Sequence, residues 1–353
     1  MRAKRWTVSI LSIILILSFV LAGCAKSGDE STNGGKAAKK SGKYTVINIG
    51  FPSSGADWAD GPLAVAKVSG YLDEYLHPLG YEAKLTGFTG AAPAIHEALT
   101  SGDLDYAYYA GFAGVLAKSK GIDTKLLAVT SFGSVWQLAV SKDSKINSLK
   151  DLKGKKIAYQ RGATPQMYVL KVLQEAGLSE KDAQLVNSTI PEGLSGLSTG
   201  AVDAAVVSYG QADELVKQGK AKVIHKGIDA DKDKFYEPNV LIGRTDFVKK
   251  HADVNVAIIK AMLKAKDQIK KDPEKYYELS AKKSGRDLKQ IKEVAVKDLN
   301  IGFPVNLDKR YLSSLKTIET FEKDNKIIQN DVDFKSWVDS SYLKKAQKEY
   351  EQK

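Results

Sequence analysis

The sequence predicts an α/β fold of two similar lobes with a ligand cleft between them. Segments rich in β-branched residues alternate with helical segments, which is typical of a mostly parallel sheet covered by helices on both faces. A helix–glycine–strand pattern also recurs, since Gly102-Asp103-Leu104-Asp105 is matched 98 residues later by Gly200-Ala201-Val202-Asp203. About 310 residues follow the N-terminal region, more than one typical core contains. Ligands commonly bind in such a cleft.

The first 23 residues predict an export signal. Met1 to Arg5 is basic, and the apolar stretch Val8–Leu21 is about 14 residues long, whereas a membrane span needs about 20. The stretch ends in Leu21-Ala22-Gly23-Cys24, which resembles a bacterial lipobox. We therefore expect a signal peptide at 1–23 and lipid, such as palmitate, on Cys24. Because Cys24 is the only cysteine, the fold contains no internal disulfide.

The segment 24–43 predicts a flexible tether. It is rich in glycine, serine, lysine and alanine and has no apolar period, so it cannot bury enough surface to fold. The formal net charge of the whole chain is +11, carried mainly by lysines spread along the sequence. This distribution indicates a solvated surface, and we expect no nucleic-acid partner.

The first lobe begins with a strand at 44–50, which ends at the turn Pro52-Ser53-Ser54-Gly55. A helix that contains Leu63 and Val65 follows. A second helix at 94–101 follows. Pro93 lies at its start, where a proline is tolerated in the first turn, and Gly102 ends it. A strand at 104–110, a loop at 111–114 and a helix at 115–119 complete this part.

The second lobe repeats this order. A strand at 156–159 is followed by the loop 160–165 and a helix at 166–176, which Gly177 ends. Another helix begins at Pro191 and ends at Gly200. The strand 202–207 follows it.

Three stretches give the chain a family resemblance. The run 146–158, from Ile146 to Ala158, resembles the second-lobe entry of solute-binding proteins of ATP-driven importers, and so do 97–105 and 200–204. Within that superfamily, the spacing is most similar to the nitrate, taurine and aliphatic-sulfonate group. The resemblance covers residues 45 to about 340 and agrees with the expected lipid anchor.

The resemblance implies a two-lobed periplasmic-binding-protein-like (type II) fold with a two-strand hinge. Lobe 1 would hold 44–138 plus 243–353, and lobe 2 would hold 139–242, with the crossings near 138–140 and 241–243. The chain would be a monomer, anchored by lipid at the extracytoplasmic face of the cell membrane. It would capture a small organic anion of the aliphatic-sulfonate or taurine-like kind by lobe closure. It would then deliver this ligand to an ABC permease and its ATPase.

The loops after the first strand of each lobe are the main site candidates. Each precedes a helix whose free N–H groups and dipole favour an anion, and serine and threonine hydroxyls add donors. Helix capping alone is the other interpretation of such hydroxyls. The predicted ligand-binding residues are Ser53, Ser54, Gly55, Trp58, Gly111, Phe112, Trp136, Arg161, Thr164, Gln166, Ser208, Tyr209, Gln211 and Phe303.

Charge and aromatic content leave the ligand open. Trp58, Trp136 and Phe303 suit a ligand with an apolar body, although Trp136 is equally compatible with a core position. Asp57 and Asp60 argue against a purely anionic ligand, and pairing with an amine on the ligand is the alternative. The alternatives in the same class are nitrate and a heteroaromatic vitamin or pyrimidine precursor.

Nothing in the sequence indicates catalysis. The four histidines show no metal-ligand spacing, and no phosphate-binding loop is present. The stretch 196–200 matches Gly-x-Ser-x-Gly but lies before a strand rather than after one. We expect no metal, no cofactor and no enzyme activity. The remaining alternatives are a sensor lipoprotein and a fold-related enzyme.

Overall fold

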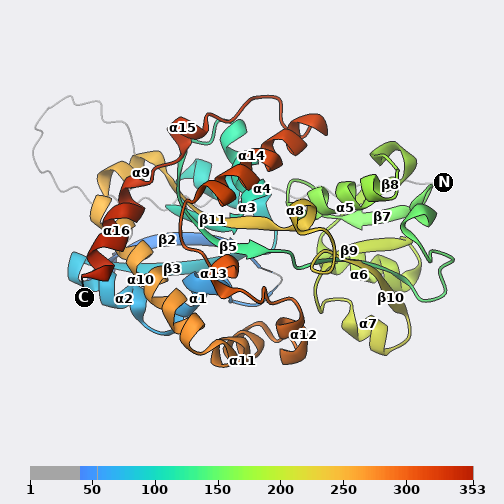
Figure 1. Cartoon of the computed structure of the whole chain (residues 1–353), viewed down its shortest axis with the longest axis horizontal. Coiled ribbons are helices and arrows are strands. Elements are labelled where there is room, and N and C mark those ends of the chain that lie inside the picture. Colours follow the sequence, from blue (N-terminus) through green and yellow to red (C-terminus); the bar gives the residue numbers. More distant parts are fainter. Residues whose placement is uncertain (1–39, 54, 353) are drawn as a thin grey trace, which may run out of the picture. The chain divides into compact units, whose positions relative to one another are not determined.

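The strands of the chain form two sheets with helices on both faces (Figure 1). The structure is a computed structural model that describes residues 40–53 and 55–352. These residues belong to a single compact unit. In this part of the chain, no helix is both long and apolar enough to cross a membrane.

The first sheet has the strand order β1-β2-β4-β11-β5. Strand β3 also belongs to this sheet and pairs with β2. The parallel strands β3, β2 and β4 are followed by β11 and β5, each antiparallel to its neighbour. Its strands are β1 (Lys40–Ser41), β2 (Tyr44–Pro52), β3 (Tyr81–Phe88), β4 (Tyr106–Ala110), β5 (Thr124–Gly133) and β11 (Glu237–Arg244).

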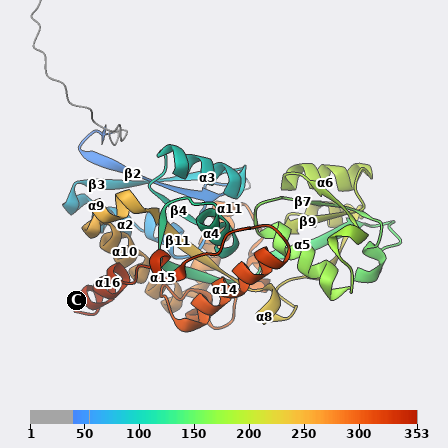
Figure 2. The ribbon, with the colours of Figure 1, turned by 90° about the horizontal axis from the view of Figure 1, so that it is seen from above.

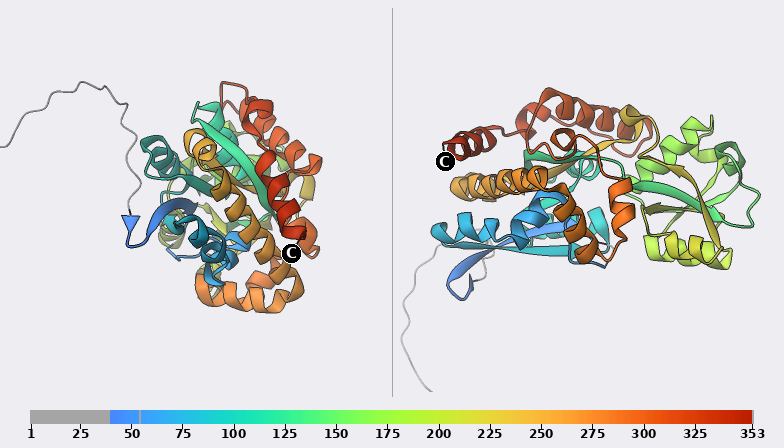
Figure 3. Two further views of the ribbon diagram at one scale, coloured as in Figure 1. Left: turned by 90° about the vertical axis from the view of Figure 1, so that its left-hand side faces the viewer. Right: turned by 60° about the horizontal axis from the view of Figure 1, so that its bottom comes forward.

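Side-chain alternation places a separate core on each face of this sheet. Ile47 and Ile49 of β2 pack with one set of helices, whereas Tyr109 of β4 and Val240 of β11 pack with the other. The first set is α1 (Gly61–Val68), α2 (Tyr71–Leu76), α10 (Ala252–Lys271) and α16 (Ser341–Glu351). The second is α3 (Ala91–Ser101), α4 (Gly111–Ser119), α14 (Lys309–Asp324) and α15 (Phe334–Trp337). The C-terminal helix α16 lies along α10 (Figure 3, right).

The second sheet has the strand order β10-β6-β9-β7-β8. Helix α5 covers one of its faces and α6 the other (Figure 2). Its strands are β6 (Trp136–Ser141), β7 (Lys156–Tyr159), β8 (Gln184–Asn187), β9 (Ala204–Ser208) and β10 (Ala221–Lys226), and the helices are α5 (Thr164–Glu175) and α6 (Ile190–Thr199). The remaining elements are η1 (His77–Leu79), η2 (Leu149–Leu152), η3 (Glu180–Asp182), α7 (Asp213–Lys217), α8 (Lys232–Phe235), α9 (Thr245–Lys250), α11 (Pro273–Ser284), α12 (Leu288–Glu293) and α13 (Leu299–Gly302).

The repeat seen in the sequence has the same structure in both sheets. The Asp105 carboxylate accepts a hydrogen bond from the backbone N–H of Asn48 at 2.9 Å, and Asp203 accepts one from that of Lys156 at 2.8 Å. In return, the backbone N–H of each aspartate donates to the carbonyl of the same partner. The two aspartates therefore fix equivalent pairs of neighbouring parallel strands, as the recurrence of Gly-x-x-Asp predicts.

The chain changes sheets earlier than the sequence suggests. It leaves the first sheet at residues 134–135, between β5 and β6, and returns through 227–236, between β10 and β11. The expected crossings at 138–140 and 241–243 instead lie inside β6 of the second sheet and β11 of the first, because each apolar run is a buried strand that stays within its own sheet. Division of the chain into two closing lobes stays a proposal.

Candidate functional site

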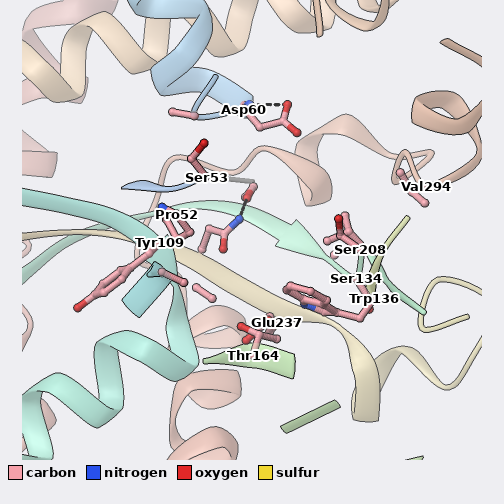
Figure 4. Close-up of a pocket in the computed structure, with 18 of the residues that line it drawn as sticks. Pro52, Ser53, Asp60, Tyr109, Ser134, Trp136, Thr164, Ser208, Glu237 and Val294 are labelled. Carbon is pink, nitrogen blue, oxygen red and sulfur yellow. Dashed lines mark hydrogen bonds between the residues drawn. The ribbon is translucent and has the colours of Figure 1, made fainter. Parts of the chain in front are cut away.

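A cavity of about 580 Å³ lies between the two sheets (Figure 4). Its walls come from the ends of β2, β4 and β5, from β6 and β9, from the start of β11 and from residues 276–303. This volume falls in the range of pockets that enclose a drug-sized molecule.

Helices α1, α3, α4, α5 and α6 all begin at this cavity. Gly61 of α1, Ala92 of α3, Ala113 of α4, Thr164 of α5 and Ile190 of α6 all lie in the first turn of their helix and line the cavity. The residues that precede α3, α4 and α5 provide no side-chain cap, although the backbone N–H of Phe112 in α4 donates to the Glu237 carboxyl. The first N–H groups of a helix have no partner within it and carry the positive end of its dipole. Their convergence makes the cavity attractive to an anion.

Two non-glycine residues at the cavity have backbone conformations normally reserved for glycine. Asp60 has φ = 59° and Ala91 has φ = 50°. Both line the cavity, and each directly precedes or begins a helix. Such conformations cost on the order of 1–3 kcal/mol and concentrate at ligand sites. They direct the starts of α1 and α3 toward the cavity.

Asp60 is the centre of a hydrogen-bond network at one end of the cavity. Its Oδ1 accepts from the hydroxyls of Tyr276 at 2.7 Å and Ser280 at 3.2 Å, and its Oδ2 lies 2.8 Å from Nη2 of Arg286. Burial by itself raises the pKa of this carboxyl. The Arg286 charge and the hydrogen bonds outweigh that effect, so the pKa of Asp60 lies below its ordinary value.

Glu237 is a second carboxyl at the cavity, on the opposite wall. It begins β11, is only 7% exposed, and its Oε2 has no hydrogen-bond partner. Burial raises the pKa of Glu237 to about 7, although polar groups of Thr164, Phe112 and Trp136 and the charge of Lys171 act against this. Near neutral pH the carboxyl is therefore partly protonated.

The charged residues that line the cavity are two carboxyls and one guanidinium. Among the described lining residues they are Asp60, Glu237 and Arg286, and Arg286 is paired with Asp60. An anion in the cavity is therefore met by N–H groups and hydroxyls rather than by an unpaired arginine or lysine. The aromatic part of the wall includes Phe132, Trp136 and Phe303.

Six of the residues predicted from sequence line this cavity. They are Ser53, Trp136, Thr164, Ser208, Gln211 and Phe303. Trp58 lies apart from it but lines a neighbouring cavity of about 660 Å³, which shares Ser53, Ser208 and Gln211 with the first. The Trp58 indole N–H donates to Ser280 at 3.2 Å, so its polar atom is used within the protein.

Three predicted residues are buried away from the cavity. Helix α4 begins at Gly111, earlier than the sequence suggests, so Gly111 packs against Pro238 and Leu315 while Phe112 is fully buried in the core. Tyr209 is 6% exposed, and its hydroxyl donates to the Glu293 carboxylate.

Three other predicted residues do not line the cavity. Arg161 is exposed, and its Nε donates to the Tyr159 hydroxyl at 3.1 Å. Gln166 accepts from the backbone N–H of Gly162 at 2.8 Å and so fixes the preceding turn. Gly55 lies in an exposed bend with φ = 110°. Ser54 and Cys24 lie outside the described residues.

The sequence interpretation missed Glu237 and most of the wall formed by residues 276–299. The sequence contains one signal for Glu237, which is an acidic residue at the start of an otherwise apolar run. The members of the other group are Tyr276, Tyr277, Arg286, Ile291, Val294, Ala295, Val296 and Leu299. They come from a region of short helices without a clear apolar period.

Comparison with known proteins gives the family of the chain. A protein-family profile described as NMT1/THI5 like matches residues 88–276, more than half of the chain. The chain belongs to the NMT1/THI5-like family. The matched region includes β4, β5, β11 and the whole second sheet, and with them much of the cavity wall.

A relative of similar length comes from Bacillus subtilis (strain 168). It is 27% identical over 349 residues, which cover 96% of this chain and 97% of that protein, and it is provisionally named an aliphatic sulfonates-binding protein. A solved structure of a protein from Methylobacillus flagellatus KT, provisionally named as the periplasmic sulfonate-binding protein SsuA, has a TM-score of 0.71 at 23% identity. It covers 88% of this chain and 96% of that one.

The same fold also carries an enzyme. The desulfurization enzyme DSZB has a TM-score of 0.68 at 17% identity, with 86% of this chain and 99% of that one covered. At these identities the structural likeness shows the fold, which is the periplasmic-binding-protein type predicted from the sequence. Among the described residues, no group of three or more His, Cys, Asp or Glu side chains is placed to hold a metal ion.

Proposed function

We propose that the chain is an extracytoplasmic solute-binding lipoprotein of an ABC importer. It captures a small organic anion of the aliphatic-sulfonate or taurine-like class by lobe closure and delivers it to the permease. The observation that carries the ligand class is the convergence of the starts of α1, α3, α4, α5 and α6 on one cavity, with no side-chain cap from the residue before α3 or α5. The names of the relatives support the same class.

The cavity chemistry suits a sulfonate head. A tetrahedral anion of low basicity needs several hydrogen-bond donors and no proton, and helix N-termini supply them. Hydroxyl groups of Thr164 and Ser208 lie in the same wall (Figure 4). The aliphatic or aromatic surface opposite them then receives the rest of the ligand.

Calorimetric titration of the full chain carrying Cys24→Ser, with ethanesulfonate as the probe, tests this function. We expect one bound sulfonate per chain, and weaker binding in Thr164→Val and Ser208→Ala by about three- to tenfold for each lost donor. Thr317→Val on the exposed side of α14 is the matched control and should bind normally. The sulfonate assignment is wrong if none of the short sulfonates binds.

A heteroaromatic vitamin or pyrimidine precursor is the second candidate ligand. The observation that favours it is the aromatic wall of Phe132, Trp136 and Phe303. In this case a pyrimidine would bind while ethanesulfonate would not, and Trp136→Ala would weaken binding more than Ser208→Ala. Nitrate is too small to contact more than a fraction of the cavity.

The anchoring and partner proposals rest on the N-terminal sequence and on the family. Lipid on Cys24 would hold the protein at the outer face of the membrane, where it would meet the permease as a monomer. Metabolic labelling with palmitate should mark the wild-type chain and leave Cys24→Ser unlabelled. Recovery of the ligand unchanged after prolonged incubation tests the proposal that the chain is not an enzyme.

A further inference from the structure

Residues 273–303, here called the cover segment, form one side of the cavity. They comprise α11, α12, α13 and the connections between them, shown in orange in Figure 1. The cover segment presents mostly hydrocarbon to the cavity, through the side chains of Ile291, Val294, Ala295, Val296, Leu299 and Phe303. Val294 faces Trp136 and Ser208 across the opening (Figure 4).

The cover segment contacts both halves of the cavity wall. Arg286 ties it to Asp60 at the start of α1, next to the first sheet. In α12, Glu293 accepts a hydrogen bond from Tyr209, and the Gln290 amide packs so closely on Gly210 that a methyl group there would collide with it. Tyr209 and Gly210 directly follow β9 of the second sheet. The cover segment therefore bridges the two sheets over the cavity.

The volume of the cavity exceeds the needs of a short ligand. At about 30 Å³ per water, 580 Å³ corresponds to roughly 20 water-sized particles. Nitrate and taurine contain only a handful of non-hydrogen atoms, so either would leave the apolar side of the cavity filled with water. A ligand whose hydrocarbon body displaces that water gains the hydrophobic contribution of each buried methylene.

We propose that the aliphatic side chains of the cover segment bind the body of the ligand and determine its specificity. The preferred ligands are sulfonates with a bulky hydrocarbon body, and short or hydrophilic sulfonates such as taurine bind more weakly. This inference rests on the proposed sulfonate-binding function. The helix N-termini recognise the head group, while the cover segment, at the opposite wall, recognises the body.

A homologous series of ligands tests the inference. The full chain carrying Cys24→Ser is titrated with ethanesulfonate, taurine, pentanesulfonate and octanesulfonate. We expect affinity to rise by about fourfold for each methylene that becomes buried. Equal affinity along the series would overturn the inference and leave the sulfonate-binding function in place. If no member of the series binds, both proposals fail.

Variants of one cover-segment residue make the test specific. Val294→Asn should reduce the gain in affinity for each added methylene, relative to ethanesulfonate binding in the same variant. Val294 is half-buried and does not support the core, so the fold should tolerate the change. Val294→Leu should preserve the increase in affinity for each added methylene. Val186→Asn, at a 37% exposed valine of β8 that does not line the cavity, is the matched control. An unchanged chain-length dependence in Val294→Asn would contradict the role of the cover segment.

Discussion

Nη2 of Arg286 lies 2.8 Å from Oδ2 of Asp60, across 226 positions of sequence. This ion pair joins the cover segment to the strained start of α1 and balances the arginine charge at the cavity. Because the guanidinium is already paired, a bound anion depends on neutral donors. The pair also explains why an aspartate, which suggested an amine-bearing ligand in the sequence, is compatible with an anionic one.

Asp60→Asn should destabilise the fold at neutral pH. The carboxylate is 45% exposed, so solvent screening limits the loss to about 1–2 kcal/mol. The pKa of Asp60 is lower in the folded protein than the ordinary 3.8, so its stabilising contribution is present above that value and disappears as the pH falls through the folded pKa.

Urea unfolding of wild type and Asp60→Asn, at neutral pH and below about pH 3, measures this difference. The free energy of unfolding of Asp60→Asn should be closer to that of the wild type in acid than at neutral pH. A deficit that is independent of pH would show that the charge of Asp60 does not contribute.

Glu322→Gln should stabilise the protein increasingly as the pH rises. Glu322 of α14 is fully buried, both of its carboxyl oxygens lack partners, and burial, together with the charges of Glu237 and Glu319, raises its pKa to about 10. The folded state retains a proton that the unfolded state loses above about pH 4.5. The wild type therefore loses up to about 1.4 kcal/mol per pH unit between those values.

Unfolding midpoints of wild type and Glu322→Gln at about pH 5 and about pH 8 test this expectation. The unfolding midpoint of Glu322→Gln should exceed that of the wild type by more at the higher pH than at the lower one. The same difference at both pH values would rule out a proton held by Glu322.

Glu237→Gln should remove the pH dependence of sulfonate binding. Since the pKa of Glu237 is about 7, raising the pH through neutrality puts a negative charge next to the cavity. We expect the affinity of the wild type for an anion to fall by up to about tenfold per pH unit above that pKa. Between about pH 4.5 and about pH 7, the unfolded chain releases the Glu237 proton while the folded protein retains it. The free energy of unfolding therefore falls as the pH rises through this range.

Titrations with octanesulfonate at about pH 6 and about pH 8 compare the two proteins. The affinity of Glu237→Gln should be nearly constant. If its affinity falls as steeply as that of the wild type, another group controls the pH response.

Tyr209→Phe should weaken the binding of all ligands by a similar factor. The variant loses the hydrogen bond from the Tyr209 hydroxyl to Glu293, which closes the cover segment against the second sheet. A bond to a partly exposed charge is worth about 1 kcal/mol, so we expect roughly a fivefold loss of affinity.

Tyr350→Phe is the matched control for this contact. Its hydroxyl donates to Asp267 at 2.8 Å on the surface of α10, away from the cavity. Titration with ethanesulfonate and octanesulfonate should show the same loss for both ligands in Tyr209→Phe and none in Tyr350→Phe. An equal loss in both variants would indicate a general effect on stability.

Local sequence patterns predicted much of the fold. The glycine and aspartate repeat correctly indicated two similar sheets, because Asp105 and Asp203 fix equivalent strand pairs through their own backbone and side-chain atoms. Ser53 and Thr164, which the sequence singled out after the first strand of each lobe, both line the cavity, and their role in ligand binding stays a prediction. Each of these patterns spans only a few neighbouring residues, so it can be recognised in a single sequence.

Long-range packing determined what the sequence did not predict. Phe112 was expected in a loop, but α4 starts one residue before it and directs its ring into the core. The cover segment reaches the cavity only through contacts such as Arg286 with Asp60 and Glu293 with Tyr209, which join positions far apart in the chain. The spacing of apolar residues within a short stretch of sequence does not predict contacts between such distant positions.

The most direct test of the account compares octanesulfonate with octanesulfonamide, which has nearly the same shape but no charge. Both are titrated calorimetrically into the full chain carrying Cys24→Ser. The account predicts one octanesulfonate per chain and binding of the sulfonamide that is weaker by about tenfold or more, because only the anion benefits from the converging helix dipoles. Equal binding of the two compounds, or no binding of octanesulfonate, would contradict an anion-binding cavity.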